Sequence, residues 1–257
     1  MKTKLIILGC GSSIGVPRID GHWGNCNKNE KKNIRTRCSA IIIKGSNSIL
    51  IDTSPDIRTQ LLANKIKHIS SVIFTHEHAD QTNGLFELRP FFWKKREKIN
   101  VYGKLSTIKH LFKSQNYLFK KTSSYVPIVK SNIIKGKNFS LGKSSEKIYF
   151  NVISLKHGKI SSLSYIFEGT AYISDCNDLS IIQKSKLKNL KYLIIDCLRF
   201  DKHPSHFNLD ESIYVHNKLK PKKTILTNLH HDLDYNYLIK HLPKNMSPAY
   251  DGLKIKL

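Results

Sequence analysis

The sequence predicts an α/β protein in which two mixed sheets pack together, with helices on their outer faces. Short apolar runs rich in Ile, Leu and Val recur along the 257 residues, as is typical of buried strands. Strand hairpins come first, strand–helix alternation follows, and the same order begins again after residue 147. No Pro/Gly-rich linker divides the chain, so we expect one domain over residues 1–257.

The first half of the chain predicts a strand, a hairpin and then alternating elements. Residues 4–8 indicate a strand, and residues 9–13 a loop in which glycine lets the backbone turn sharply. Residues 39–44 and 48–52 indicate a hairpin. The run Asp52-Thr-Ser-Pro indicates a helix start, and we expect that helix to reach about Ala63. Further strands are expected at 71–74 and 98–102, and helices at 85–88 and 105–112.

The second half follows a stretch that is hard to assign. Residues 113–147 are rich in Lys, Ser and Asn without a clear period, so short strands and loops are expected there. Later strands are expected at 147–155, 164–168, 171–174, 192–196, 224–226 and 248–257. Later helices are expected at 179–186, 209–218 and 235–241.

The composition favours a globular protein of a reducing compartment. An apolar content of 40% in a chain of this length can form a core without covalent cross-links. The five cysteines are scattered and odd in number, which does not indicate a disulfide framework. No apolar run approaches the roughly 18 residues of a membrane span. We therefore expect a cytoplasmic protein with no membrane partner.

The net charge of +24 raises the question of a nucleic-acid partner. Only seven of the 43 basic residues are arginine, and the lysines are spread along the chain instead of forming a stripe. Arginine is the residue that best matches phosphate geometry. This distribution leaves nucleic acid open but does not favour it, and it is compatible with a small anionic substrate.

The central motif is His76-Glu-His78-Ala-Asp80, which follows the apolar run 71–74. Imidazole and carboxylate together are the usual ligands of zinc, iron and manganese. The competing interpretation is two surface histidines beside an aspartate that caps a helix. Further candidates follow later predicted strands, where functional groups tend to gather. They are His157, Asp175 and the run His230-His231-Asp232.

These residues resemble the metal-binding signature of the metallo-β-lactamase superfamily. The runs 9–18, 35–39, 52–56, 227–235 and 248–252 look like one branch of it. That branch is similar to the cyclic phosphodiesterase of bacterial phosphonate breakdown and, more distantly, to the tRNA 3′-processing endonuclease. The resemblance covers nearly the whole chain and is weakest from about 104 to 147. It implies a four-layer αβ/βα sandwich, two mixed sheets with helices outside.

The resemblance also implies a set of metal ligands. A first divalent ion, Zn or Mn, would be held by His76, His78 and His157, with Asp175 as a bridge to a second ion held by Asp80 and a late histidine. We favour His230 over His231 because Asn228 stands where some relatives have histidine, and residues two apart in a strand share a face. Asp52 is expected to orient a ligand imidazole from behind.

Gln81 departs from the family pattern, which usually has a histidine directly after the aspartate. A neutral amide is a poor substitute for imidazole, so a second ion should bind weakly or be absent. The chain would then use one ion. A catalytically inactive relative would require further losses, and the other ligands are present.

The expected activity is metal-assisted hydrolysis of a small or cyclic phosphodiester. The metal would lower the pKa of a bound water so that hydroxide attacks phosphorus, and Asp80 would orient it. In the segment from His203 to His206, His206 resembles the family's proton donor to the leaving oxygen. Arg18 or Arg199 would clamp the phosphate.

Three other functions remain open. One is an RNA 3′-end endonuclease, which the charge favours but the lack of a recognisable tRNA-gripping arm does not. Another is a thioester or lactam hydrolase, against which the His203–His206 segment argues. The third is a binding protein that has lost its metal site. The resemblance also implies a homodimer, which no apolar stripe in the sequence demonstrates.

Overall fold

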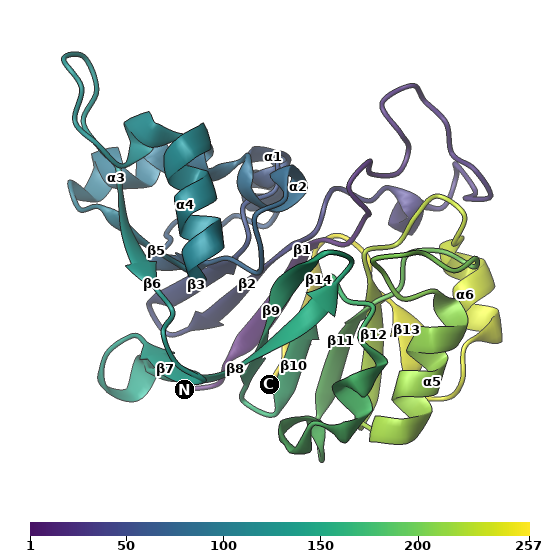
Figure 1. Cartoon of the computed structure of the whole chain (residues 1–257). Helices are drawn as coiled ribbons and strands as arrows, with labels where there is room; N and C mark the ends of the chain where they lie inside the picture. The colour runs from purple at the N-terminus through teal and green to yellow at the C-terminus, as the bar shows by residue number, and fades with distance from the viewer.

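The computed structural model describes residues 1–257 and confirms the predicted four-layer sandwich. Two seven-stranded sheets face each other, and helices cover their outer faces (Figure 1). The first sheet has the order β14-β1-β2-β3-β4-β5-β6. Its strands, in that order, are Leu253–Lys256, Lys4–Gly9, Ser39–Lys44, Asn47–Ile51, Ser71–Ile73, Ile99–Gly103 and Val129–Ile133.

The second sheet repeats this design. Its order is β13-β12-β11-β10-β9-β8-β7. Its strands, in that order, are Met246–Pro248, Lys223–Thr227, Tyr192–Asp196, Thr170–Ile173, Ile160–Phe167, Ile148–His157 and Asn138–Leu141. In each sheet one half is antiparallel and the other half, β3 to β6 or β10 to β13, is parallel. The carboxyl ends of the parallel strands therefore meet at one edge of each sheet.

Helices lie on two sides of the sandwich (Figure 1). Those that follow strands of the first sheet are α1 (Ile57–Ala63), α2 (Ala79–Thr82), α3 (Arg89–Lys95) and α4 (Leu105–Ser114). Those that accompany the second sheet are α5 (Leu209–Leu219) and α6 (Tyr235–His241). Short 3₁₀ helices lie at Lys31–Asn33, Leu85–Leu88, Asn116–Leu118, Ser144–Glu146, Leu179–Gln183 and Ser185–Leu187.

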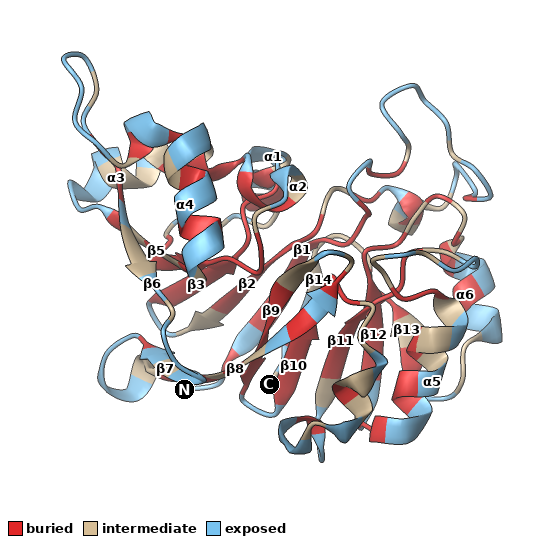
Figure 2. Ribbon diagram, viewed as in Figure 1, coloured by how far each residue is buried: buried red, intermediate tan, exposed pale blue.

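Three apolar clusters form the core, one for each interface between layers. The central cluster joins the two sheets and includes Ile7 and Ile42 from the first and Phe150, Tyr165 and Ile194 from the second. The other two clusters lie between each sheet and its helices. Buried residues accordingly run along the strands of both sheets (Figure 2). All five cysteines are buried free thiols, and none of the helices combines the length and the apolarity needed to cross a bilayer.

The two sheets are also tied by hydrogen bonds at the carboxyl end of β4. The Tyr165 hydroxyl donates to the Phe74 carbonyl at 2.6 Å, and the Leu163 N–H donates to the Thr75 carbonyl at 2.8 Å. Both donors belong to β9 of the second sheet. The segment that carries His76 and His78 is therefore held against the second sheet.

Three predicted elements differ in the structure. The helix expected from Asp52 begins only at Ile57, because Asp52 adopts a left-handed backbone with φ of 60°. The helix expected at 179–186 is two 3₁₀ helices. The final strand expected at 248–257 is divided into β13 and β14, which belong to different sheets, since a turn with Gly252 at φ 85° separates them.

That turn carries Asp251, a half-buried residue whose carboxylate holds the Gly-rich loop after β1. It accepts the Cys10 N–H at 3.0 Å and the Thr36 N–H at 2.8 Å. The Thr36 hydroxyl also donates to it. Burial raises the pKa of Asp251 to about 6 despite these donors. One side chain thus joins three segments distant in sequence.

Replacing Asp251 by Ala should destabilise the protein by about 2–4 kcal/mol, because three donors lose their acceptor and two of them are backbone N–H groups. Urea unfolding measures this. The matched control is Asp201→Ala at an exposed position, which should change the free energy of unfolding by less than about 0.5 kcal/mol. Equal effects of the two substitutions would contradict the role given to Asp251.

Candidate active site

Three predicted histidines come together at the edge where the two sheets meet. His76 and His78 follow β4, and His157 is the last residue of β8. One ring nitrogen from each lies within 4.8 Å of the others. His78 Nδ1 and His157 Nε2 are 3.3 Å apart. The structure therefore brings these three residues together, as the sequence predicts.

His76 is oriented by a relay that begins at Asp52. The Thr75 hydroxyl donates to Asp52 Oδ2 at 2.8 Å, so it can only accept from His76 Nδ1, which is 3.0 Å away. The Thr75 N–H donates to the other carboxylate oxygen at 2.8 Å. His76 therefore carries its proton on Nδ1. Its Nε2 keeps a lone pair, and that atom is buried without a hydrogen-bond partner.

His157 is oriented in the same way by a backbone carbonyl. Its Nδ1 lies 2.7 Å from the Ser205 carbonyl oxygen, which can only accept, so Nδ1 carries the proton. Its Nε2 lone pair consequently faces His78. Gly158 permits this approach, since it has φ of 59° and a Cβ there would lie 2.9 Å from Ser205 Cβ.

A second group of ligand-competent atoms lies beside the first. Atoms of His157, Asp175 and His206 are within 4.8 Å of one another. His206 Nδ1 donates to Asp196 Oδ2 at 2.8 Å and is 4.0 Å from Asp175 Oδ1. The fully buried Asp196 is a site residue that the sequence analysis missed. The available signal was its position as a carboxylate at the end of an apolar strand.

The charges of these groups follow from burial and from one another. Burial lowers the pKa of His76 to about 3, and burial followed by the neighbouring His157 lowers the pKa of His78. Burial and then the charge of Asp175 raise the pKa of Asp80 to about 6. Burial would lower the pKa of His206, but Asp196 outweighs it and raises that pKa to about 9. Neutral imidazoles of His76 and His78 thus lie beside a protonated His206 and the acidic groups of the site.

These groups open into a cavity of about 340 Å³. His78, Asp80, His157, Asp175, His203 and His206 line it, together with Ser12 and Ser13 of the Gly-rich loop. Arg199 also lines this cavity, whereas Arg18 does not and is instead paired with Asp20 on an exposed loop. Of the two arginines considered for the phosphate, only Arg199 is in place.

His230, the histidine favoured as the last ligand, does not lie on a strand. β12 ends at Thr227, and Asn228 has a left-handed backbone with φ of 63°, so the alternation of a strand does not extend to residue 230. His230 lines the cavity, but its Nδ1 donates to Asp232 at 2.9 Å and it groups with His231 and Asp232. The Asn228 amide is the group beside Asp175 Oδ1, at 3.4 Å. The strand alternation that favoured His230 therefore does not reach it, and its role as a ligand stays a prediction.

Gln81 is fully buried next to the acidic residues. Its Nε2 donates to Asp80 Oδ2 at 3.0 Å, and its Oε1 has no hydrogen-bond partner. Asp80 belongs to neither cluster of ligand atoms.

The residues present suit a divalent cation at the three histidines. Buried polar atoms normally have a hydrogen-bond partner, yet His76 Nε2 and Asp175 Oδ2 have none. His157 Nε2 can accept a hydrogen bond from His78 Nδ1 at 3.3 Å. A cation could accept the lone pairs of the three imidazole nitrogens, with the Asp175 carboxylate in the adjoining group of ligand atoms. Three imidazoles with a carboxylate are an ordinary donor set for zinc.

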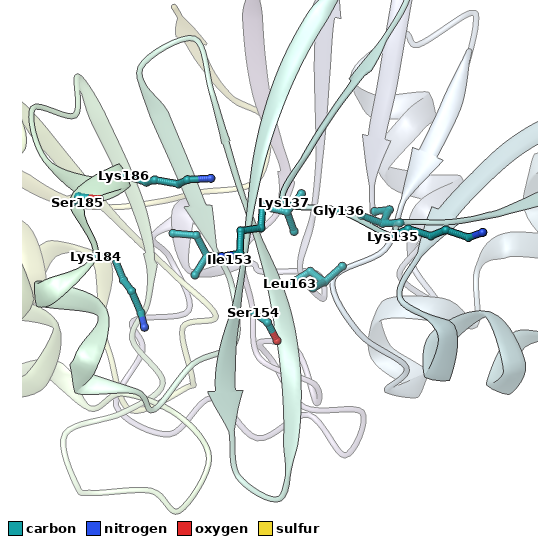
Figure 3. Close-up of a pocket in the computed structure, with 11 residues that line it drawn as sticks. Lys135, Gly136, Lys137, Ile153, Ser154, Leu163, Lys184, Ser185 and Lys186 are labelled. Atoms are coloured by element: carbon teal, nitrogen blue, oxygen red, sulfur yellow. The ribbon is translucent and has the colours of Figure 1, made fainter.

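A larger cavity of about 570 Å³ lies elsewhere and has a different character. Four lysines line it, Lys135, Lys137, Lys184 and Lys186, together with apolar residues that include Leu163 (Figure 3). No histidine or carboxylate lines it. The groups able to do chemistry are therefore in the smaller cavity.

Comparison with known proteins agrees with this geometry. The sequence profile described as "Beta-lactamase superfamily domain" matches residues 47–230. An octanoyltransferase of Porphyromonas gingivalis is 29% identical over 255 residues, which are 98% of this chain and 51% of that protein. The chain thus spans about half the length of this relative.

Solved structures place the whole chain on the same fold. A diphosphatase of the PhnP family has a TM-score of 0.88 and 30% identity, covering 100% of this chain and 98% of its own. The short form of human tRNase Z has a TM-score of 0.69 and 15% identity, covering 98% of both chains. The resemblance found in the sequence is confirmed, and the chain belongs to the beta-lactamase superfamily.

Proposed function

We propose that this chain is a metal-dependent phosphodiesterase that hydrolyses a small or cyclic phosphodiester. The observation that carries the proposal is the pairing of two features in one cavity: three converging imidazole nitrogens, and beside them the buried ion pair of His206 and Asp196. The first feature suits a metal, and the second suits a proton donor. The similarity to a diphosphatase supports substrates in which a bond to phosphorus is broken.

The three histidines and Asp175 would hold the ion, Zn or Mn. When bound, such an ion lowers the pKa of water toward neutrality and screens charge on phosphoryl oxygens. The chain prepares the site by fixing the tautomers of His76 and His157. Because the Thr75 hydroxyl and the Ser205 carbonyl fix the protons on Nδ1, both Nε2 lone pairs stay free.

Asp80 would orient the attacking water, and His206 would donate a proton to the leaving oxygen. Asp80 lines the cavity and, once ionised, can accept a hydrogen bond from the attacking water and orient it. Asp196 stabilises a protonated His206 through Nδ1, which leaves the Nε2 proton available for the leaving oxygen as its bond to phosphorus breaks. Arg199 is the guanidinium available to the phosphate.

An RNA 3′-end endonuclease is the second candidate, favoured by the net charge of +24. Cleavage of a precursor tRNA at its 3′ end, faster than hydrolysis of cyclic nucleotides, would favour this function over the first.

Hydrolysis of bis(p-nitrophenyl) phosphate should depend on added Zn or Mn and should stop when a chelator is present, because the proposed activity requires the ion. Release of p-nitrophenolate measures this. Restored turnover after the metal is returned in excess is the control for chelator damage. No turnover with either metal would overturn the enzymatic proposal.

Replacing His206 by Gln should have an effect that depends on the leaving group. An alkoxide leaves only when protonated, so hydrolysis of a nucleoside 2′,3′-cyclic phosphate should slow by about 100- to 10,000-fold. p-Nitrophenolate is a weak base, and hydrolysis of bis(p-nitrophenyl) phosphate should slow by less than about tenfold.

The control for His206 is His203→Gln, which removes a nearby imidazole of the same cavity. It should change both rates by a similar factor. A loss in His206→Gln that is the same for both substrates would show that His206 is not the proton donor.

Replacing Thr75 by Val should weaken metal binding by about 10- to 100-fold, because partners that orient a ligand histidine contribute that much to affinity. The Val side chain keeps the shape but leaves His76 Nδ1 and Asp52 Oδ2 without the hydroxyl. Thr75→Ser retains the hydroxyl and should bind metal like the unmodified protein. Competition with a chromophoric chelator measures both, and similar affinities for the two variants would rule out the relay.

A further inference from the structure

We propose that this chain holds one divalent ion, at the three histidines, and that the side-chain amides of Gln81 and Asn228 take the place of a second ion. This inference rests on the proposed function, since it concerns the same site. It goes beyond it by fixing the number of ions and the residues that set that number. Family resemblance puts a histidine at position 81, and in some relatives also at position 228.

Asn228 directs N–H bonds at the carboxylates of the site. Its Nδ2 is 3.1 Å from the Ser174 carbonyl oxygen, 3.1 Å from Asp196 Oδ1 and 3.4 Å from Asp175 Oδ1. The amide has two hydrogens, and the two nearest oxygens, of Ser174 and Asp196, take them, so Asp175 Oδ1 at 3.4 Å lies beside the amide nitrogen without a full hydrogen bond from it. His206 Nδ1 lies 3.1 Å from the same nitrogen. A carbonyl oxygen can only accept, so the nitrogen of the amide, and not its oxygen, must be on this side. A hydrogen-bond donor therefore stands where a metal ligand would need a lone pair.

Gln81 likewise directs a side-chain N–H at Asp80. Its Nε2 is 3.0 Å from Asp80 Oδ2. Turning the amide over would bring its carbonyl oxygen against the carboxylate oxygen, which is repulsive. The backbone of Gln81 is fixed as well, because its carbonyl accepts the Thr53 N–H at 2.7 Å and its N–H donates to the His78 carbonyl at 3.0 Å. The side chain is fully buried.

Together the two amides change what the acidic residues can bind. Asp80 and Asp175 are the carboxylates left for a second ion. An amide N–H is directed at Asp80 Oδ2, and an amide nitrogen lies 3.4 Å from Asp175 Oδ1. The imidazoles that the resemblance puts at positions 81 and 228 are missing, and the nearby His206 is engaged through Nδ1 by Asp196. Zinc sites draw on imidazole as well as carboxylate, so two carboxylates faced by amide nitrogens form a poor site.

The site formed by the three histidines does not involve residues 81 and 228. His76 Nε2 and Asp175 Oδ2 have no hydrogen-bond partner. His157 Nε2 faces His78 Nδ1 at 3.3 Å. The Gln81 N–H partly compensates the negative charge of Asp80, as a second cation would. The chain should therefore bind one ion at the three histidines, while hydrogen bonds occupy the place of a second ion.

The test counts ions without measuring activity. Purified protein is titrated with Zn²⁺ against a chromophoric chelator, and its metal content is measured after gel filtration. The unmodified protein should bind one ion per chain tightly. Its Mn²⁺ form should give the electron paramagnetic resonance spectrum of isolated ions, with no exchange-coupled pair. Because these measurements use the unmodified protein, they do not depend on whether a variant folds.

The double variant Gln81→His/Asn228→His should bind a second ion and show the coupled Mn²⁺ spectrum. Histidine is among the residues that tolerate the left-handed backbone of position 228. The matched control, Gln183→His/Asn116→His, adds two histidines at exposed positions and should still bind one ion.

Each outcome separates this inference from the proposed function. Two tightly bound ions in the unmodified protein would overturn the inference and leave the proposed function standing. No bound ion at all would overturn the proposed function. A folded double variant that still binds one ion would show that residues 81 and 228 do not set the number.

Discussion

The convergence of three imidazoles at one edge of the sandwich is the constraint on which the site depends. His76 Nε2 is buried without a hydrogen-bond partner, which is unfavourable by itself, and it lies beside the hydrogen-bonded pair of His78 and His157. The chain nevertheless fixes this arrangement through the Thr75 hydroxyl and the Ser205 carbonyl. A divalent cation would accept the lone pairs of the three imidazoles, and its binding would remove the unfavourable free energy of the unpartnered nitrogen.

The two sheets of the sandwich position the residues of the site. The segments after β3 and β4 come from one sheet, whereas β8, β10, β11 and β12 end at the site from the other. Hydrogen bonds from Tyr165 and Leu163 join the sheets at that end. Two site residues, Asp52 and Asn228, have left-handed backbones, which are uncommon outside glycine and are found where function requires them.

Much of this could be predicted from the sequence because it depends on local pattern. Apolar runs gave most strands, and the His76–Asp80 motif with His157 and Asp175 gave the ligand set by resemblance. What failed depends on single backbone angles that no periodicity encodes. The positive φ of Asp52 delays α1, the Gly252 turn divides the last strand, and the positive φ of Asn228 ends the alternation that selected His230. Asp196 was missed because its role appears only when His206 folds against it.

A divalent cation should bind among His76, His78 and His157. Anomalous diffraction at the zinc or manganese absorption edge, from crystals grown with the metal, tests it most directly. We expect a strong peak between His76 Nε2, His78 Nδ1 and His157 Nε2, without a second peak of similar height beside Asp80. The absence of a peak among the three histidines, in crystals soaked with excess metal, would contradict it.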